Sequence, residues 1–213
     1  MKLVAPILPS LLEKPNDASD AFLHVDEVSG VQVEDSWLTS DDLNKVSLSE
    51  SVFIKTDFSQ VNANRFDVTD CVFKGCNFSA SKFPESGWRR VSIEGARCSG
   101  LQLTHSALKD IEFKNCKLEI ANFRFSRIEN VRFTECVLDD VDFYHAQLKN
   151  VEFINCTINR ITFANARMLS VDISGSIVEG INGINSLRGV TMSYDQLLQL
   201  APHFAAEAGI KIK

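Results

Sequence analysis

Cysteine and histidine are the side chains of this sequence with the most chemical potential, because both ligate metals and thiols can also form disulfides. Four of the six cysteines are separated by multiples of 20 residues. They are Cys76, Cys116, Cys136 and Cys156. The same interval also holds Thr56, Ala96 and Ser176, so any small residue suits these positions. We therefore interpret the cysteines as buried packing residues and expect neither a metal nor a redox site.

No motif of the common enzyme classes is present. The sequence lacks G-x-S-x-G, H-E-x-x-H, a P-loop and a dinucleotide fingerprint. Catalysis requires ionisable groups that are placed in a pocket, and the repeated positions described next hold no pair of carboxylates. We expect no enzyme and no cofactor.

The chain is organised by a period of five residues. Every fifth residue from Val33 to Val178 is apolar, and phenylalanine is the commonest choice among them. The residue two positions earlier in each unit is mostly small or β-branched, and the other three are largely polar. This period fits neither a helix nor a long strand, so it predicts a chain that turns a corner every five residues and buries two residues of each unit.

The repeat resembles the pentapeptide-repeat family, whose unit is commonly written A-(D/N)-L-x-x. Residues 121–125 (Ala-Asn-Phe-Arg-Phe) and 141–145 (Val-Asp-Phe-Tyr-His) match this unit well, and the match covers roughly residues 46–180. The resemblance implies an all-β solenoid, a right-handed quadrilateral β-helix with four pentapeptides per coil. Residues 20 apart should then stack, which places His105 and His145 about 10 Å apart, too far to share a metal.

A solenoid needs caps at its two ends, and the sequence predicts three segments. We expect an N-terminal cap segment over 1–30, the β-helix over 31–180 and a C-terminal α-helical cap over 181–213. Ser193 and Gln196 form a capping-box pattern at the start of the helix, and Pro202 should kink or split it.

One side of this helix is apolar. It carries Leu197, Leu200, Ala201, Phe204, Ala205 and Ala208. The side could cover the last coil, and it could also join two copies into a homodimer, as C-terminal elements do in topoisomerase-interacting members of the family. Both interpretations stay open at this point.

Two groups of outward residues are candidate contact surfaces. An aromatic group is the candidate interaction surface, because exposed rings among polar residues often mark interfaces. It consists of His105, Arg124, Phe125, Tyr144 and His145. A second group forms a weakly basic face that could contact nucleic acid. It consists of Arg89, Arg90, Lys109, Arg127, Lys149 and Arg167.

Charge separates the remaining functions. The best-known role in the family is mimicry of DNA towards DNA gyrase and topoisomerase IV, which requires an acidic rod. The net charge is −6, but residues 1–50 carry −7 and residues 51–180 are neutral, with sixteen residues of each sign. The unbroken phase also excludes the projecting loops of quinolone-protection members. Our hypothesis is therefore a scaffold that binds an unidentified protein, and the alternative is a DNA-mimic modulator of a type II topoisomerase or a quinolone-resistance protein.

Location follows from what the chain lacks. No apolar run reaches 18 residues, so we expect no membrane partner. Pro6 and Pro9 interrupt the apolar start, which is too short for a secretory signal. We expect a cytoplasmic protein, and the neutral rod does not favour nucleic acid as its partner.

Overall fold

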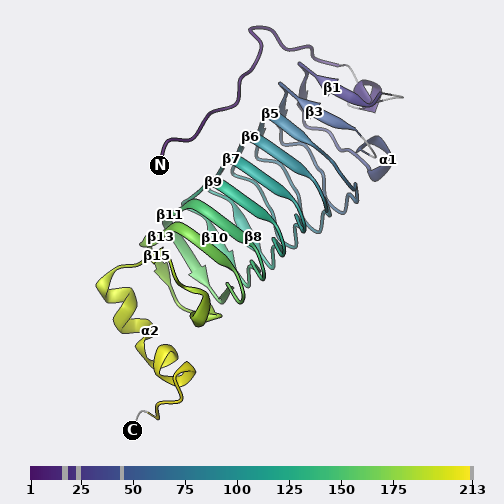
Figure 1. Ribbon diagram of the computed structural model, residues 1–213. Helices are drawn as coiled ribbons and strands as arrows, with labels where there is room; N and C mark the ends of the chain where they lie inside the picture. The colour runs from purple at the N-terminus through teal and green to yellow at the C-terminus, as the bar shows by residue number, and fades with distance from the viewer. Residues whose placement is uncertain (16–18, 23–24, 44–45, 212–213) are drawn as a thin grey trace.

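The fold is a rod of stacked strands that ends in one helix (Figure 1). A computed structural model of the chain describes residues 1–15, 19–22, 25–43 and 46–211. Every strand pair among them is parallel, and most partners are 20 residues apart, as in Val68↔Trp88 and Phe113↔Phe133. The chain is therefore a β-solenoid of about eight turns with four pentapeptides per coil, and the predicted fold class is confirmed.

The elements follow one another in a simple order. The strands are β1 (Glu27–Ser29), β2 (Gln32–Glu34), β3 (Ser47–Ser49), β4 (Val52–Ile54), β5 (Val68–Lys74), β6 (Gly87–Glu94), β7 (Ala107–Lys114), β8 (Lys117–Glu119), β9 (Arg127–Thr134), β10 (Val137–Asp139), β11 (Gln147–Asn159), β12 (Ile161–Thr162), β13 (Arg167–Val178), β14 (Ile181–Asn182) and β15 (Val190–Thr191). The helices are η1 (Ser19–Phe22), α1 (Ser40–Leu43), η2 (Ile184–Ser186) and α2 (Tyr194–Glu207).

The five-residue period is a backbone property. Among the described residues, 23 that are not glycine have a positive φ, and the number of every one ends in 0 or 5. This left-handed conformation redirects the chain at the last residue of each pentapeptide, and the next unit begins a new side of the coil. Gly75, Gly95 and Gly100 occupy the same position, where glycine carries no steric penalty.

The inside of the rod is filled by the residues that recur every fifth position. All thirty positions from Val33 to Val178 are buried except Met168, which is partly buried. Phenylalanine rings stack from coil to coil, with centroids of Phe113 and Phe133 5.0 Å apart and those of Phe133 and Phe153 4.9 Å apart. Burial of each ring contributes about 1.5–3 kcal/mol, so the columns supply much of the stability.

The second inward position is small for a reason that the sequence alone does not show. At most of the positions that hold Ser, Thr or Cys, the hydroxyl or thiol donates a hydrogen bond to the carbonyl 23 residues earlier, one coil down. Ser81 Oγ donates to Phe58 O at 2.6 Å, and Cys136 Sγ donates to Phe113 O at 3.3 Å. Small polar side chains therefore link neighbouring coils without taking space from the phenylalanines.

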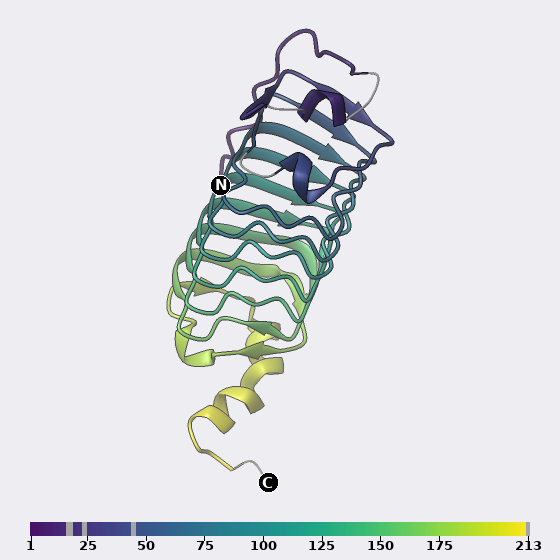
Figure 2. The same cartoon turned by 90° about the vertical axis from the view of Figure 1, so that its right-hand side faces the viewer.

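The coil is irregular in two places. Helix α1 replaces part of a side within the first coils, yet Leu43 at its end is buried and the phase continues (Figure 2). Near the other end the spacing between paired residues departs from 20. Ile154 pairs with Gly175, and Val171 pairs with Val190. Both departures lie near the ends of the rod, so the middle coils from β5 to β11 are the regular part.

The N-terminal residues close the first coil and then turn back along the rod. Glu13 forms a parallel bridge with Val31, and its backbone hydrogen bonds to Gly30 O and from the Gln32 amide measure 2.8 and 2.7 Å. The residues before it run beside the stacked coils in the direction of the C-terminal end (Figure 1).

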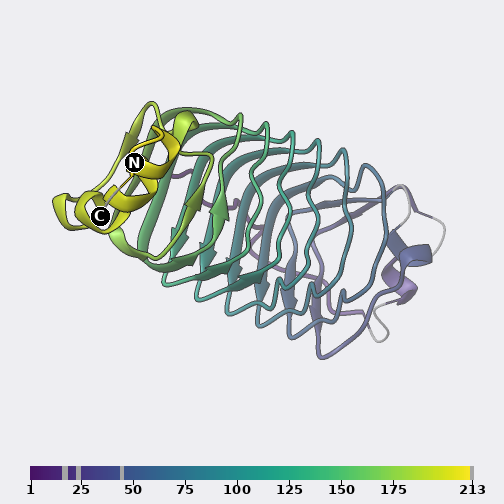
Figure 3. The ribbon, with the colours of Figure 1, turned by 90° about the horizontal axis from the view of Figure 1, so that it is seen from below.

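Helix α2 lies at the opposite end of the rod, beyond β15 (Figure 3). The predicted capping box is confirmed, since Ser193 Oγ accepts from the Gln196 amide at 3.2 Å and Gln196 Oε1 accepts from the Ser193 amide at 2.8 Å. The helix runs through Pro202 and is not split by it. Gln196 Nε2 also donates to Ile173 O and Ser176 O, which ties the helix to the last coil.

Candidate interaction surface

The five residues of the predicted aromatic group lie together on one edge of the rod. His105, Phe125 and His145 each end the corresponding pentapeptide in three successive coils, and each has a left-handed backbone. The ring of Phe125 stacks between the two imidazoles, with centroid distances of 4.8 Å to His105 and 5.4 Å to His145. We call this set, with Arg124 and Tyr144, the aromatic corner.

Tyr144 and Arg124 extend the stack sideways. The Tyr144 ring stands perpendicular to Phe125, with centroids 5.8 Å apart, and the Arg124 guanidinium lies 4.6 Å above the Tyr144 ring. Arg124 Nε also lies 3.6 Å from Asp142 Oδ2, an ion-pair contact without a hydrogen bond. The result is a continuous π surface with a cation at one side.

Phe125 occupies a backbone conformation that bulky side chains avoid. Its φ is 60°, and its side chain is 45% exposed. The same column holds Asn165, a residue type that tolerates the left-handed conformation well. A phenylalanine here gains no core burial to offset the strain, and its ring packs on the two imidazoles instead.

The predicted basic residues share a face with one exception. Arg89, Lys109 and Lys149 lie in one outward column. Glu129 lies between the two lysines in this column, and its Oε1 is 2.8 Å from Lys149 Nζ. Arg127 and Arg167 lie in the neighbouring column. This basic face directly follows the aromatic corner around the coil.

Arg90 leaves that face. Its Nε donates to Asp70 Oδ1 at 2.6 Å, and its Nη2 contacts the other carboxylate oxygen. The hydrogen bond from Arg90 lowers the pKa of the Asp70 carboxyl, which is almost fully buried. Sequence reasoning placed Arg90 with Arg89 and missed this pair, although Arg90 ends a pentapeptide and follows Asp70 by the 20 residues of one coil.

The apolar side of α2 divides between the rod and the surface. Leu200 is buried, and Phe204 and Ala205 are half-buried. Leu197, Ala201 and Ala208 are exposed, and so is Leu198 beside them. The helix therefore covers the last coil through a narrow strip and leaves leucines uncovered.

The cysteines are part of the packing between coils. Cys76, Cys116, Cys136 and Cys156 each donate to the carbonyl 23 residues earlier, as Ser176 and Thr56 do in the same column. All six cysteines are free and buried. Within the described residues, no group of His, Cys, Asp and Glu side chains is arranged to hold a metal ion.

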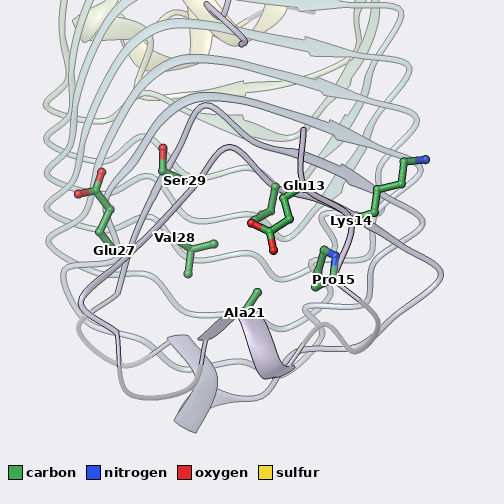
Figure 4. A pocket seen from close by; sticks show the side chains of 8 residues that line it. Glu13, Lys14, Pro15, Ala21, Glu27, Val28 and Ser29 are labelled. Carbon is green, nitrogen blue, oxygen red and sulfur yellow. The ribbon is translucent and has the colours of Figure 1, made fainter. Parts of the chain in front are cut away.

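A hollow of about 420 Å³ opens where the coil stack begins (Figure 4). The side chains of Val28, Ala21 and Glu13 line it, and Glu27 lies at its periphery. The hollow lies at the N-terminal end of the core column, beside the bridge between Glu13 and Val31.

Comparison with known proteins decides the family. The pentapeptide repeat region family model matches residues 66–131 and 106–182, which together span more than half of the chain. The chain belongs to the pentapeptide-repeat family. Members are generally structural or interaction proteins. No curated protein matches this pentapeptide-repeat chain significantly.

Several solved structures are similar to this pentapeptide-repeat protein at low sequence identity. HetL from the cyanobacterium Nostoc sp. strain PCC 7120, involved in heterocyst differentiation regulation, is 17% identical over 78% of this chain and 89% of its own, with a TM-score of 0.44. QnrB1, a plasmid-mediated fluoroquinolone resistance protein, is 17% identical over 87% and 99%, with a TM-score of 0.34. Rfr23 from the cyanobacterium Cyanothece 51142 is 13% identical over 66% and 86%, with a TM-score of 0.33.

The structure adds one observation on membranes. Among the helices of the described residues, none is both long and apolar enough to cross a bilayer.

The buried thiols predict how the stability of this pentapeptide-repeat protein depends on pH. Burial raises the pKa of Cys71 and of Cys76 to about 12, from a usual value of 9.0. Above pH 9 the unfolded chain therefore binds fewer protons than the folded chain, and the free energy of unfolding falls as pH rises towards 12. Each thiol should contribute about 1.4 kcal/mol per pH unit over this range.

Urea unfolding at pH 8 and pH 10 measures this effect. The comparison is with Cys76→Ser, because the difference between the two proteins isolates the effect of this thiol. The serine hydroxyl keeps the donor that Thr56 and Ser176 supply in the same column. The variant should lose less stability than the wild type between the two pH values. Equal losses would contradict the prediction.

Proposed function

We propose that this protein is a non-enzymatic scaffold that binds another protein through the aromatic corner. The observation that carries the proposal is the ring of Phe125, which is held between two imidazoles and remains 45% exposed. Aromatic residues and arginine dominate the binding energy of protein interfaces, and the corner combines three of these residue types in one patch.

The geometry suits recognition without rearrangement. Stacking orders the rings of His105, Phe125 and His145 before a partner arrives, and the Arg124 guanidinium lies against the Tyr144 ring. Groups that are already ordered lose little entropy on binding, so a small preformed patch can contribute disproportionately to affinity. The rod beneath the aromatic corner has a filled core, and it therefore supports the corner rigidly.

The alternative proposal is modulation of a type II topoisomerase by DNA mimicry. A mimic must present unpaired negative charge along the rod. Here many acidic side chains pair with a basic one from the neighbouring coil. Such pairs are Arg65–Glu85, Lys114–Glu94, Arg132–Glu152 and Lys149–Glu129. This pairing supports the scaffold over the mimic.

A second copy of the chain is the partner that we propose for α2. Tyr194, Leu197 and Leu198 are exposed on the helix, and Ile177 is exposed on the last coil. Apolar residues gathered at one end of a rod favour a symmetric contact between two such ends. This contact leaves the aromatic corner free for another protein.

The scaffold proposal predicts that Phe125→Asn abolishes partner binding and leaves the fold intact. Asparagine accepts the left-handed backbone and relieves strain of roughly 1 kcal/mol, while the lost ring stacking costs about 1 kcal/mol. The free energy of unfolding should thus change by less than about 1 kcal/mol. Affinity purification with crosslinking and mass spectrometry identifies the partner and compares its recovery by each variant.

Ile120→Asn is the matched control. Ile120 also has a left-handed backbone, with φ 56°, and it is more exposed than Phe125, but it lies outside the aromatic corner. Partner recovery should be retained with Ile120→Asn and lost with Phe125→Asn. Retention by both variants would remove the aromatic corner from the proposal.

The scaffold and the mimic separate in a gyrase supercoiling assay with and without a quinolone. A neutral rod should neither inhibit supercoiling nor restore it in the presence of the drug. Inhibition or protection by the wild-type protein would favour the topoisomerase alternative.

Sedimentation equilibrium tests the proposed homodimer. The wild-type chain should sediment as a dimer at high micromolar concentration, and replacement of Leu197 and Leu198 by serine should yield a monomer, because it removes exposed apolar area without touching buried Leu200. A monomeric wild-type chain would refute the contact.

A further inference from the structure

The first residues of the chain lie in a polar groove along one edge of the rod. This edge is formed by the column of Asp70, Asp110, Asn130 and Asn150 and is the next corner after the basic face. The Ile7 amide donates to Asp70 Oδ1 at 2.9 Å. Farther along, Arg132 Nη2 donates to Met1 O at 2.7 Å, and the Met1 amino group lies 2.6 Å from Glu152 Oε1. We call residues 1–7 the strap.

The strap matches the rod in length. Asp70 and Asn150 are 80 residues apart, which is four coils of 20 residues and about 19 Å at ~4.8 Å per coil. The six steps from Met1 to Ile7 span about 20 Å at ~3.3 Å per residue in an extended chain. The strap is therefore straight, and its two ends reach anchors that the coils place at the right separation.

The anchors are held in place by the rod itself. Asp70 is almost fully buried, and Arg90 binds both of its carboxylate oxygens. Arg132 stands between two carboxylates, 2.9 Å from Glu152 Oε2 and 3.9 Å from Glu112 Oε1. At one end of the groove the Asp70 carboxylate accepts a hydrogen bond from the strap. At the other end Arg132 donates to the strap, and the Glu152 carboxylate accepts from it.

The groove contacts the backbone of the strap more than its side chains. Ile7 is 63% exposed, Val4 is exposed, and only Leu3 and Pro6 are half-buried. Proline restricts a chain to extended conformations, which suits a straight groove. Recognition that rests on a backbone amide, a backbone carbonyl and a cation does not require this one side-chain sequence.

The strap also leaves part of the groove unfilled. A cleft of about 410 Å³ lies between the strap and Glu112, Arg132 and Val91. A second cleft, of about 540 Å³, continues past Met1 along Asn150, Ser170 and Asp172. The carboxylates of Glu112, Glu152 and Asp172 along this line favour positive charge at that end of a ligand.

We infer that this corner groove is a binding site for an extended peptide, which the strap occupies in cis. The ligand class is a proline-containing segment of another protein that carries a cation at its N-terminal end, next to Glu152. Such a segment competes with the strap for Asp70 and Arg132. The site is distinct from the aromatic corner, and its test does not depend on the partner of that corner.

The test uses the full chain with two variants at one residue. Ile7→Pro removes the amide that Asp70 binds, whereas Ile7→Ala keeps it, and both lose the same exposed side chain. The probe is a synthetic peptide of residues 1–10, with a fluorophore at its C-terminus, and anisotropy reports its binding. The Ile7→Pro chain should bind the peptide about ten-fold more tightly than the Ile7→Ala chain, because its own strap has lost a hydrogen bond to a charged group.

A third variant locates the bound peptide. Arg132→Ala in the Ile7→Pro chain should abolish binding, because it removes the donor to the first carbonyl of the strap. Circular dichroism should show an unchanged fold in the two Ile7 variants, since the strap contributes nothing to the core column. Equal peptide affinity for both Ile7 variants, no binding to Ile7→Pro, or binding that survives Arg132→Ala would each overturn the inference.

Discussion

A residue with a left-handed backbone at every fifth position turns the chain by one corner, and the other features of the rod depend on this turn. Because the turns recur without an insertion through the middle coils, residues 20 apart stack directly. The conformation costs roughly 1–2 kcal/mol at each residue that is not glycine. Parallel strand pairing and the stacked core residues offset that cost, so neither the turns nor the coils would persist without the other.

The same constraint organises the outside of the rod. Side chains that are distant in sequence become neighbours, so each surface is formed by columns of residues 20 apart and not by consecutive residues. The aromatic corner, the basic face and the strap groove are consecutive around the coil, at residues such as Phe125, Lys109 and Asn130. A partner that covered all three would meet rings, positive charge and then carboxylates. This order explains how a rod of zero net charge can still present surfaces of distinct chemistry.

Periodic features could be predicted from the sequence because each repeat obeys the same local rule. The phase alone places Phe133 inside and Phe125 outside, and the spacing of 20 brings His105, Phe125 and His145 together. The capping box at Ser193 is equally local. The strap could not be predicted, since its contacts join residues 63 to 151 positions apart and do not follow the spacing of the repeat.

The helix α2 shows the limit of pattern reasoning within one element. Its apolar spacing indicates a buried side, but not which part of that side meets the last coil. Burial of Leu200 and exposure of Leu197 follow from the two hydrogen bonds of Gln196 to the coil, which fix how the helix is turned. A polar side chain thus decides the placement of an apolar face.

Those two hydrogen bonds have a further consequence. A stack of parallel strands is open-ended in principle, since its last coil offers carbonyls to which another chain could add. Gln196 occupies Ile173 O and Ser176 O, and at the far end Glu13 pairs with the backbone of Gly30 and Gln32. At each end a segment of the same polypeptide thus occupies backbone groups of the ladder, and fewer of them remain for the open-ended addition of further rods.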